Sequence, residues 1–594
     1  MIKKIKELMG MEEFETTDQE KSVWNFVEKR YEESKSGRPD ADWVKWMKLY
    51  NFDHWEGGRP SYKASLVTNF CFSNVETIVP IMTDQPPRVY ILPQSDDDIE
   101  YAETMGKVLD YVWTSVCDLD YLLPNVLRTA LILGTSFVKV NWCKEKGPKG
   151  DIEVIPLKPE SVYVDPNARD LENAAFVIIA EIKTLEEIKE LYPEEGHRVQ
   201  PDKNLSGERD CALVLECWFK DRTVEDYKEK IELSGEDVEV FAKQKKYPNG
   251  RVIVAANRVV LKDSSNPYKD GKFPIVRFID YPKTHSVWGT GEIEIIESLQ
   301  LEHNKRKSQV VDIMNLTANP IWVVDHQSGV DIDNLTNRPG LVVEKNRGTE
   351  VRRDAPPPLP SYVFQSIEHT EGNMDAISGV HDVTQGRRPT GVTAASSILE
   401  LQEAAQTRIR LKVRYFEASL RELSKMLISR VQQFYNDDRL IRLVSREYQP
   451  IILTFNSDME LTDEQSRSKK TPYKQNFEIK IATGSTLPVS KTARYQQGVQ
   501  LFSLECLDQE AMLEAAEWPN RKAVINRMNQ AKQQMMEANL SAQQPQPGPP
   551  MEGAPPGGAP MEGQPLGQGA PQGLPGQLPG QTQMLPEEAG MEEG

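Results

Sequence analysis

The side chains that most often catalyse reactions or hold metals are scattered along this chain. Its seven histidines never pair at metal-ligand spacing, and its six cysteines contain no Cys-x-x-Cys pair. The phosphate-binding GxxxxGK[S/T], metalloprotease HExxH and hydrolase GxSxG signatures are absent from the sequence. Gly289-Thr290-Gly291 lacks the third glycine of a dinucleotide loop. We therefore predict no enzyme active site, no cofactor and no metal centre.

Two local clusters admit a sharper interpretation. Asp325 and His326, with Asp331 and Asp333, offer oxygen and nitrogen ligands, but Leu335 occupies the third ligand position of a calcium loop. A solvated turn is the preferred interpretation. Cys211 and Cys217 are six residues apart on a predicted strand, which places both on one face. We expect them to be two core thiols.

Basic residues gather in four places. These are Lys305, Arg306 and Lys307; Arg347, Arg352 and Arg353; Arg387 and Arg388; and Arg408, Arg410, Lys412 and Arg414. Each group is either a solvated face or a place where phosphates are touched transiently. No aromatic residues interleave them, so they do not form a platform on which bases stack.

Composition limits the function classes further. The 594 residues include 71 Lys and Arg against 90 Asp and Glu, a formal charge of −19 and a pI near 5.1. Tight binding along a nucleic-acid backbone needs clustered cations and is disfavoured. No apolar run is long enough to cross a membrane, and the N-terminus lacks the apolar core of a signal peptide. We expect reduced thiols in a protein made in the cytoplasm.

Residues 541–594 differ from the rest of the chain. They hold 12 Pro, 12 Gly and nine Gln, and no aromatic residue. Such a segment buries too little apolar surface to offset the entropy of ordering it. We predict a disordered tail after a folded part that ends near residue 540.

The elements before residue 289 indicate an α+β fold with a mainly antiparallel sheet. The first 60 residues have helical periodicity, and helices are expected at 98–118, 120–133 and 184–192, the second ending at Gly134. Alternating patterns predict a hairpin of 136–142 with 151–156. Further strands are expected at 161–164, 174–183, 211–220, 251–262 and 273–279.

After Gly289, apolar residues recur mainly with helical spacing instead of the alternation typical of strands. A helix is predicted over 292–316, a small insert with strands 321–324 and 340–343 follows, and a second helix covers 361–377. From Ile398 to Phe434, ten apolar steps cover 36 residues, a mean of 3.6, which predicts one very long amphipathic helix. Strands at 440–444, 450–455 and 476–482 precede helices within 490–538.

This order of parts, from about residue 20 to 535, resembles the portal proteins, or head-to-tail connectors, of tailed bacteriophages. The resembling segments are 133–140 (LGTSFVKV), 154–165 (VIPLKPESVYVD), 289–292, 383–386 (VTQG) and 390–395 (TGVTAA). The resemblance implies an α/β wing at 1–288 with returning strands at 437–488, and a long-helix stem at 289–318 and 361–378. It also implies a small strand-rich clip at 319–360, a tunnel loop at 379–396, a spine helix at 397–436 and a helical crown at 489–540. The tail, 541–594, takes the place of the helical barrel found in some portals.

The resemblance also implies a function. A homo-oligomeric ring, usually of twelve chains, stands at one capsid vertex and forms the channel for packaging and ejecting double-stranded DNA. Its partners are the terminase large subunit, a head-completion or adaptor protein, tail proteins, and the major capsid and scaffolding proteins. The expected place is the virion, after synthesis in the host cytoplasm, with no membrane and no catalysis.

Within that frame the basic groups receive roles. Arg387 and Arg388 in the tunnel loop are expected to make mobile DNA contacts, with Lys305, Arg306 and Lys307 as stem channel candidates. Arg347, Arg352 and Arg353 are candidates for docking partners on the clip. Two alternatives stay open: another structural virion protein, such as a minor capsid or tail component, and a metal-dependent nucleic-acid enzyme, for which the sequence offers no persuasive carboxylate set.

Overall fold

A computed structural model describes residues 17–542, with gaps. The gaps are 56, 58, 84–88, 94–98, 203–209, 234–235, 337, 339–340, 355–356, 381–406, 437–438, 445–449, 456–477, 482–497, 500, 505–507 and 516–520. The chain divides into two units, Met1–Asn520 and Arg521–Gly594. In the second unit the structure describes helix α14 (Arg521–Ala542). All other elements below belong to the first unit.

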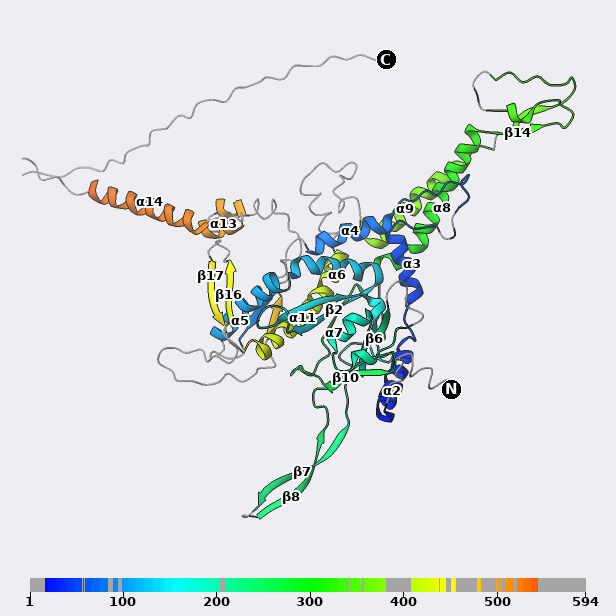
Figure 1. The fold of residues 1–594 in the computed structure, drawn as a ribbon. Helices are drawn as coiled ribbons and strands as arrows, with labels where there is room; N and C mark the ends of the chain where they lie inside the picture. Colours follow the sequence, from blue (N-terminus) through cyan, green and yellow to red (C-terminus); the bar gives the residue numbers. More distant parts are fainter. Residues whose placement is uncertain are drawn as a thin grey trace, which may run out of the picture. The chain divides into compact units, whose positions relative to one another are not determined.

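The predicted helices before residue 134 are confirmed (Figure 1). They are α2 (Asp18–Ser34), α3 (Asp40–Tyr50), α5 (Ile99–Tyr111) with the π-turn η2 (Val112–Val116), and α6 (Leu119–Leu133). A further helix, α4 (Phe70–Thr83), was not predicted. Apolar side chains of α6 such as Leu123, Leu127 and Ala130 are buried in the main core. The helix ends at Gly134, whose φ of 81° is the left-handed conformation that glycine adopts without strain.

Gly134 also explains the Gly289-Thr290-Gly291 motif. A Cβ on Gly134 would lie 2.3 Å from the carbonyl oxygen of Gly289, and one on Gly291 would lie 2.8 Å from the amide nitrogen of Gly134. Two backbone segments far apart in sequence therefore touch where any side chain would separate them. These glycines serve close packing between the end of α6 and the start of the next long helix.

Two antiparallel sheets confirm the predicted α+β class. A three-stranded sheet has the order β11–β2–β3, with β2 (Thr135–Cys143), β3 (Asp151–Leu157) and β11 (Ile275–Ile279). A five-stranded sheet has the order β10–β9–β6–β5–β4, with β4 (Val162–Val164), β5 (Phe176–Thr184), β6 (Cys211–Phe219), β9 (Arg251–Ala256) and β10 (Val259–Ser265). Helix α7 (Leu185–Leu191) follows β5, and α2 packs on this second sheet through Val27.

The single strand predicted at 251–262 is wrong. Asn257 and Arg258 have φ of 42° and 72°, so the chain reverses there and β9 pairs with β10 as a hairpin. Two consecutive left-handed residues are what a tight two-residue hairpin turn requires. A second hairpin that no sequence pattern indicated joins β7 (Val224–Leu233) to β8 (Glu236–Lys245).

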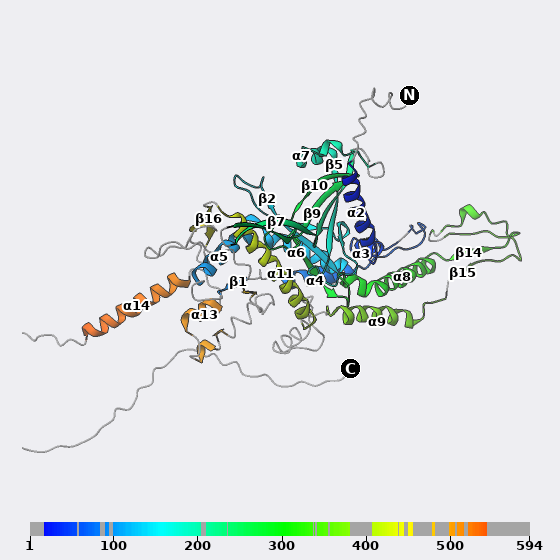
Figure 2. The same ribbon diagram turned by 90° about the horizontal axis from the view of Figure 1, so that it is seen from below.

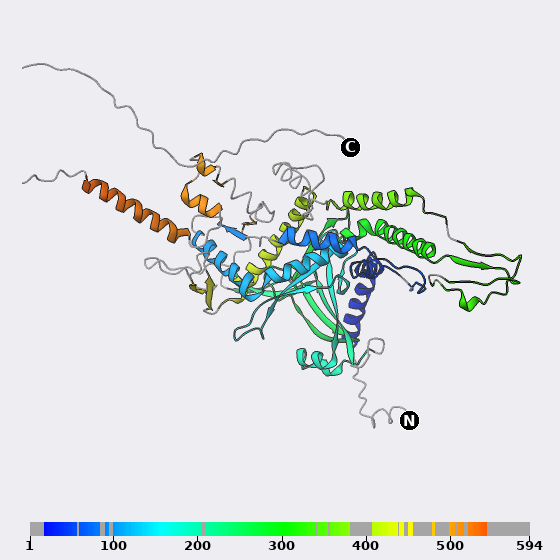
Figure 3. The ribbon, with the colours of Figure 1, turned by 90° about the horizontal axis from the view of Figure 1, so that it is seen from above.

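Two helices after residue 291 lie side by side, as Figures 2 and 3 both show. They are α8 (Glu292–Ala318) and α9 (Ser361–Ser378), and both were predicted. Short strands β12 (Tyr281–Pro282) and β13 (Gly289–Thr290) precede α8. Between α8 and α9, β14 (Ile321–Val324) is confirmed, but the strand predicted at 340–343 is wrong. Residues 341–343 are not extended into a ladder, and β14 pairs instead with β15 (Val351–Asp354).

The long amphipathic helix is confirmed over the described part as α11 (Thr407–Phe434). Its predicted apolar stripe is buried, including Val413, Leu420 and Leu427, and the helix contacts β11 and β2. The predicted strands after it are present as β16 (Arg439–Val444), β17 (Pro450–Phe455) and β18 (Glu478–Ile481); β18 pairs with an unanticipated β1 (Val89–Leu92). Within 490–538, α13 (Gln509–Ala515) and α14 are described helices.

Three predictions fall on residues that the structure does not describe. They are the tunnel loop from 381 onward, the start of the spine helix at 397–406, and the tail from 543 onward. Among the described residues, no helix is both long and apolar enough to cross a membrane.

Candidate functional site

The pairing of α8 with α9 gives the three basic residues at 305–307 different contacts. Arg306 Nε lies 2.7 Å from Glu302 Oε1, and Arg306 also donates a hydrogen bond to Ser366 on α9. Lys307 Nζ lies 3.0 Å from Glu371 Oε1, also on α9. Lys305 is exposed, and no described residue forms an ion pair with it. Two of the three cations thus hold the helix pair together, and the third projects into solvent.

Glu371 is the centre of this contact between the two helices. Its Oε1 lies 2.8 Å from Nε2 of His303, whose side chain is fully buried on α8. Burial alone would raise the pKa of Glu371, but the hydrogen bonds with His303 and Lys307 outweigh it and lower that pKa. The carboxylate is therefore held ionised between two donors from α8.

Another side of α8 binds an extended segment through a ladder of polar side chains. We call residues 64–70 the strap. The acceptors on α8 are spaced by four residues, and the amides on the strap by two: Gln300 Oε1 to Phe70 N (2.8 Å), Asn304 Oδ1 to Thr68 N (3.0 Å), Ser308 Oγ to Leu66 N (3.0 Å) and Asp312 Oδ1 to Ala64 N (2.6 Å). Four helical residues rise about 6 Å and two extended residues about 6.6 Å, so the two repeats stay in step.

The clip candidates lie on and around β15. Arg353 stacks over Trp322 of β14 at 4.3 Å from the ring centroid and donates to the Thr336 carbonyl. Arg352 is 54% exposed and has two long ion pairs, 3.4 Å to Glu350 and 3.6 Å to Asp354. Arg347 is exposed, without an ion pair to any described residue. Arg352 and Arg353 both belong to the sheet of this insert, opposite Val323 and Trp322 of β14.

Large apolar side chains are exposed in the same insert. Val342 is 86% exposed and Ile332 72%, while Ile321 and Val323 of β14 are 63% and 42% exposed. At the neighbouring helix ends, Met314 and Tyr362 are also more than half exposed. Single exposed apolar residues are ordinary, whereas these six all belong to one small insert and the helix ends beside it.

The two clusters considered for metal or thiol chemistry have structural roles. Asp325 accepts a hydrogen bond from the Glu350 amide and Asp331 accepts one from the Asp333 amide, as expected of a solvated turn. No group of three metal-ligating side chains is found within the described residues. Cys217 is buried and Cys211 half-buried, both as free thiols, and burial raises the pKa of Cys217 well above its ordinary value.

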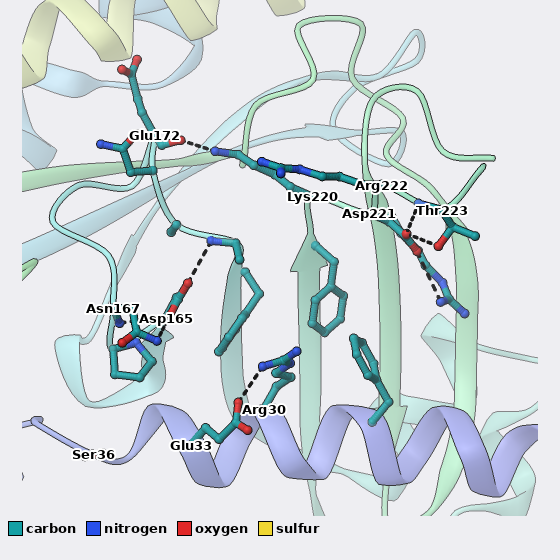
Figure 4. A pocket seen from close by; sticks show the side chains of 18 residues that line it. Arg30, Glu33, Ser36, Asp165, Asn167, Glu172, Lys220, Asp221, Arg222 and Thr223 are labelled. Atoms are coloured by element: carbon teal, nitrogen blue, oxygen red, sulfur yellow. Dashed lines mark hydrogen bonds and ion pairs between the residues drawn. The ribbon is translucent and has the colours of Figure 1, made fainter. Parts of the chain in front are cut away.

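A pocket of about 1060 Å³ lies between α2 and the five-stranded sheet (Figure 4). Phe26, Phe176 and Phe219 line it, and the Arg30 guanidinium lies 5.6 Å from the centroids of the first two rings. Its polar side chains largely satisfy one another: Arg30 pairs with Glu33, Lys220 donates to the Glu172 carbonyl, and Asp221 accepts from Thr223. Because both signs of charge alternate around it, the pocket favours no ionic ligand.

The basic group near the middle of α11 contains a residue whose role sequence reasoning missed. Lys412 was grouped with a solvated face, but its side chain is 2% exposed and pairs with Asp280 and Glu292. One signal was available: Lys412 follows the buried Ile409 by three residues and precedes the buried Phe416 by four, which places it on the apolar stripe. Arg408, by contrast, is exposed and donates to the Ala376 and Ile377 carbonyls at the end of α9.

Arg387 and Arg388 lie outside the described residues, so their geometry is not part of this site.

Comparison with known proteins gives a family match and similarity to solved structures. The model of the P22-like phage portal protein family matches residues 48–565, well over half of the chain. Among solved structures, a chain from the virion of a native gene transfer agent particle is similar, with 11% sequence identity and a TM-score of 0.40. The similarity covers 83% of this chain and 99% of that one. No curated protein matches the sequence.

Proposed function

Because the chain belongs to the P22-like phage portal protein family, we propose that its copies form a ring at one capsid vertex through which DNA passes. Membership confirms the resemblance predicted from the sequence and makes the chain a structural component of a bacteriophage virion. The family is structural rather than enzymatic. The family match over residues 48–565 is the observation that carries the proposal.

We propose a ring of twelve chains, in which each clip and stem contacts its neighbours. The exposed apolar side chains of the insert support this arrangement, because a lone chain leaves Ile332 and Val342 in water. A ring of identical chains needs one surface that is complementary to a different surface on the next copy. The paired helices α8 and α9 form a rigid element that can carry both of these surfaces.

The proposed channel is lined by the stem and the tunnel loop. Lys305, which forms no ion pair with a described residue, would be the stem cation that meets a phosphate, because Arg306 and Lys307 are occupied by contacts that hold α9. Arg387 and Arg388, in the proposed loop 379–396, supply further mobile charge. A net charge of −19 per chain suits DNA that slides, since a strongly cationic lining would bind the backbone tightly.

The proposed partners beyond DNA meet the clip and the wing. The clip, with Arg347, Arg352 and Arg353, would dock the terminase large subunit during packaging and a head-completion or adaptor protein afterwards. Major capsid and scaffolding proteins would surround the wing.

Electron microscopy and mass measurement of the purified protein test the ring. We expect rings with a central hole and a mass near that of twelve 67.4-kDa chains, about 0.8 MDa. Filaments or compact particles without a hole would instead favour another structural virion protein.

A matched pair of variants tests which surface closes the ring. Val342→Asp places a charge where the lone chain is already exposed, so the fold should persist. The protein concentration at which rings form should rise at least tenfold, which corresponds to about 1.4 kcal/mol per contact. Leu191→Asp, on the 51% exposed Leu191 of α7, should leave rings unchanged. Normal rings with Val342→Asp would remove the clip from the proposed interface.

A further inference from the structure

Three elements of the chain meet at a buried cluster of charges. Asp280 follows β11, Glu292 is the first residue of α8, and Lys412 lies on α11; their side chains are 0%, 1% and 2% exposed. The Lys412 ammonium pairs with Asp280, lies 2.5 Å from Glu292 Oε1, and is 3.9 Å from the ring centroid of Tyr281. One lysine thus joins the wing sheet, the proposed stem and the proposed spine.

The cluster holds one carboxylate more than its lysine can balance. Asp280 Oδ2 and Glu292 Oε2 have no hydrogen-bond partner among the described residues, although both atoms are buried. The charged or titratable groups that act on Asp280 are Lys412, Glu292 and, beside it, Tyr281. From the end of α6, the Gly134 carbonyl accepts a hydrogen bond from the Asp280 amide at 3.2 Å.

An unbalanced buried charge is costly, and binding a proton is the least costly way to remove it. The pKa of Asp280 is raised from 3.8 to about 7: burial raises it most, Lys412 lowers it, and Glu292 raises it again. A proton on the carboxyl pair would leave one carboxylate facing one ammonium, which is neutral.

The surroundings make this cluster a joint between elements. Gly291 caps α8 and is packed so closely that an added Cβ would lie 2.6 Å from the Leu131 carbonyl oxygen. The first turn of α8 therefore cannot shift slightly within its seat; it is either seated against α6 or displaced. The ion cluster lies at the point where the first turn of α8 is seated.

We propose that Asp280, Glu292 and Lys412 form a proton-dependent joint, which clamps the start of α8 to β11 and α11 while one of the two carboxyls carries a proton. When the proton leaves to solvent, two carboxylates face one ammonium and the joint opens more often. The joint lies within one chain, so it goes beyond the proposed ring and does not depend on it.

The sign of the effect follows from linkage. Asp280 binds its proton more tightly in the closed joint than in an open, solvated one, where its pKa returns towards 3.8. The stabilisation is complete at low pH and is lost as pH rises through about 7. Opening should therefore increase by up to about tenfold per pH unit between about pH 4 and about pH 7, and level off above that.

Amide hydrogen exchange of the full-length protein, corrected for the intrinsic pH dependence of exchange, tests the joint. Peptides that cover 289–300 and 407–416 should lose protection over this pH range, whereas peptides from β5 and β6 should not. Asp280→Asn should keep both segments protected and remove the pH dependence, since the remaining Lys412–Glu292 pair is neutral. Glu294→Gln, which removes a half-exposed carboxylate of the same turn that pairs with Lys283, should behave as the wild type.

If Asp280→Asn does not fold, Glu292→Gln makes the same prediction, because it too leaves one carboxylate for Lys412. Wild-type protection that stays constant across the range would overturn the joint. So would a pH dependence that persists unchanged in either variant.

Discussion

At the scale of single residues, burial and pairing decide what each cation of this chain can do. Lys412 is committed to two buried carboxylates, and Arg306 and Lys307 are committed to the contact between α8 and α9. Lys305 and Arg347 are exposed without an ion pair to a described residue. Only some residues of the basic groups, such as Lys305 and Arg347, are therefore available to contact a phosphate.

The first residue-scale prediction concerns the tunnel loop. Arg387→Ala/Arg388→Ala should leave ring assembly intact and reduce packaged or retained DNA, because the pair is proposed to touch phosphates transiently rather than to hold neighbouring chains. DNA content per particle measures it. Lys189→Ala/Lys262→Ala removes the same charge from two exposed wing positions and should package normally. Normal packaging by the arginine variant would leave the tunnel loop without its proposed contact.

A second residue-scale prediction concerns pH. Arg198 binds both carboxylate oxygens of Glu20 on α2, at 2.8 and 3.1 Å, and these hydrogen bonds lower the pKa of Glu20 from 4.5 to about 2. Because Arg198 binds the ionised carboxylate, the contact has its full stability above pH 4.5 and loses it as the pH falls towards about 2. Because solvent screens this pair, Glu20→Gln should weaken the contact of α2 with Arg198 at neutral pH by about 0.5–1 kcal/mol and flatten its acid dependence.

Hydrogen exchange of α2 amides between neutral and acid pH measures this effect. Glu28→Gln, on an exposed position of the same helix, provides the control and should retain the wild-type acid response. Equal acid sensitivity in Glu20→Gln and wild type would show that another group anchors α2.

Some residue roles were beyond reach of sequence reasoning for a physical reason. The closeness of Gly134 to Gly289 joins positions 155 residues apart, and no local pattern records such a contact. Sequence reasoning could reject a phosphate loop at Gly289-Thr290-Gly291 but could not supply its packing role. Lys412 was misassigned because its charge was given more weight than its place on the apolar stripe.

At the scale of elements, long periodic segments were predictable and turns were not. An apolar period of 3.6 residues predicted α11 over its described part, and an apolar period of two residues predicted the pairing of β2 with β3. Runs of apolar residues continue on both sides of Asn257-Arg258, and this pair contains no glycine or proline, so one strand was predicted where a hairpin exists. Between α8 and α9, 341–343 and 351–354 are both short apolar-containing segments, and only tertiary pairing selects the second.

The strap provides the element-scale prediction. Asn304→Ala/Ser308→Ala would leave the amides of Thr68 and Leu66 without their acceptors. Because both hydrogen bonds are only partly buried, each loss should cost about 0.5–1.5 kcal/mol. The strap should then open locally, so hydrogen exchange at 64–70 should accelerate while α6 stays protected.

Lys305→Ala/Gln309→Ala changes two exposed positions on the same turns of α8 and should leave the strap protected. If the ladder variant exchanges at wild-type rates, the side chains of α8 do not hold the strap. Ring packing, such as that of Phe70 against His303 with centroids 5.2 Å apart, would then be sufficient to hold the strap.

At the scale of the whole molecule, the negative charge is distributed unevenly along the chain. Residues 543–594 contain six Glu and no Lys or Arg, so they contribute −6 of the −19. The remaining −13 belongs to residues 1–542, where buried and paired cations take up much of the positive charge. A ring of such chains would repel DNA at long range, which favours passage over capture.

Removing residues 543–594 tests both the ring and this view of charge. The truncated chain keeps α14 whole and loses a segment whose composition predicts no packed core, so rings of unchanged subunit number should form. Because each subunit also loses six negative charges, truncated rings should bind short duplex DNA more tightly than full-length rings at low salt, and the difference should vanish as salt screens it. Mass measurement and DNA binding at two salt concentrations check the two parts separately. Loss of rings would assign the tail a role in assembly, whereas intact rings with unchanged DNA binding would contradict only the electrostatic role.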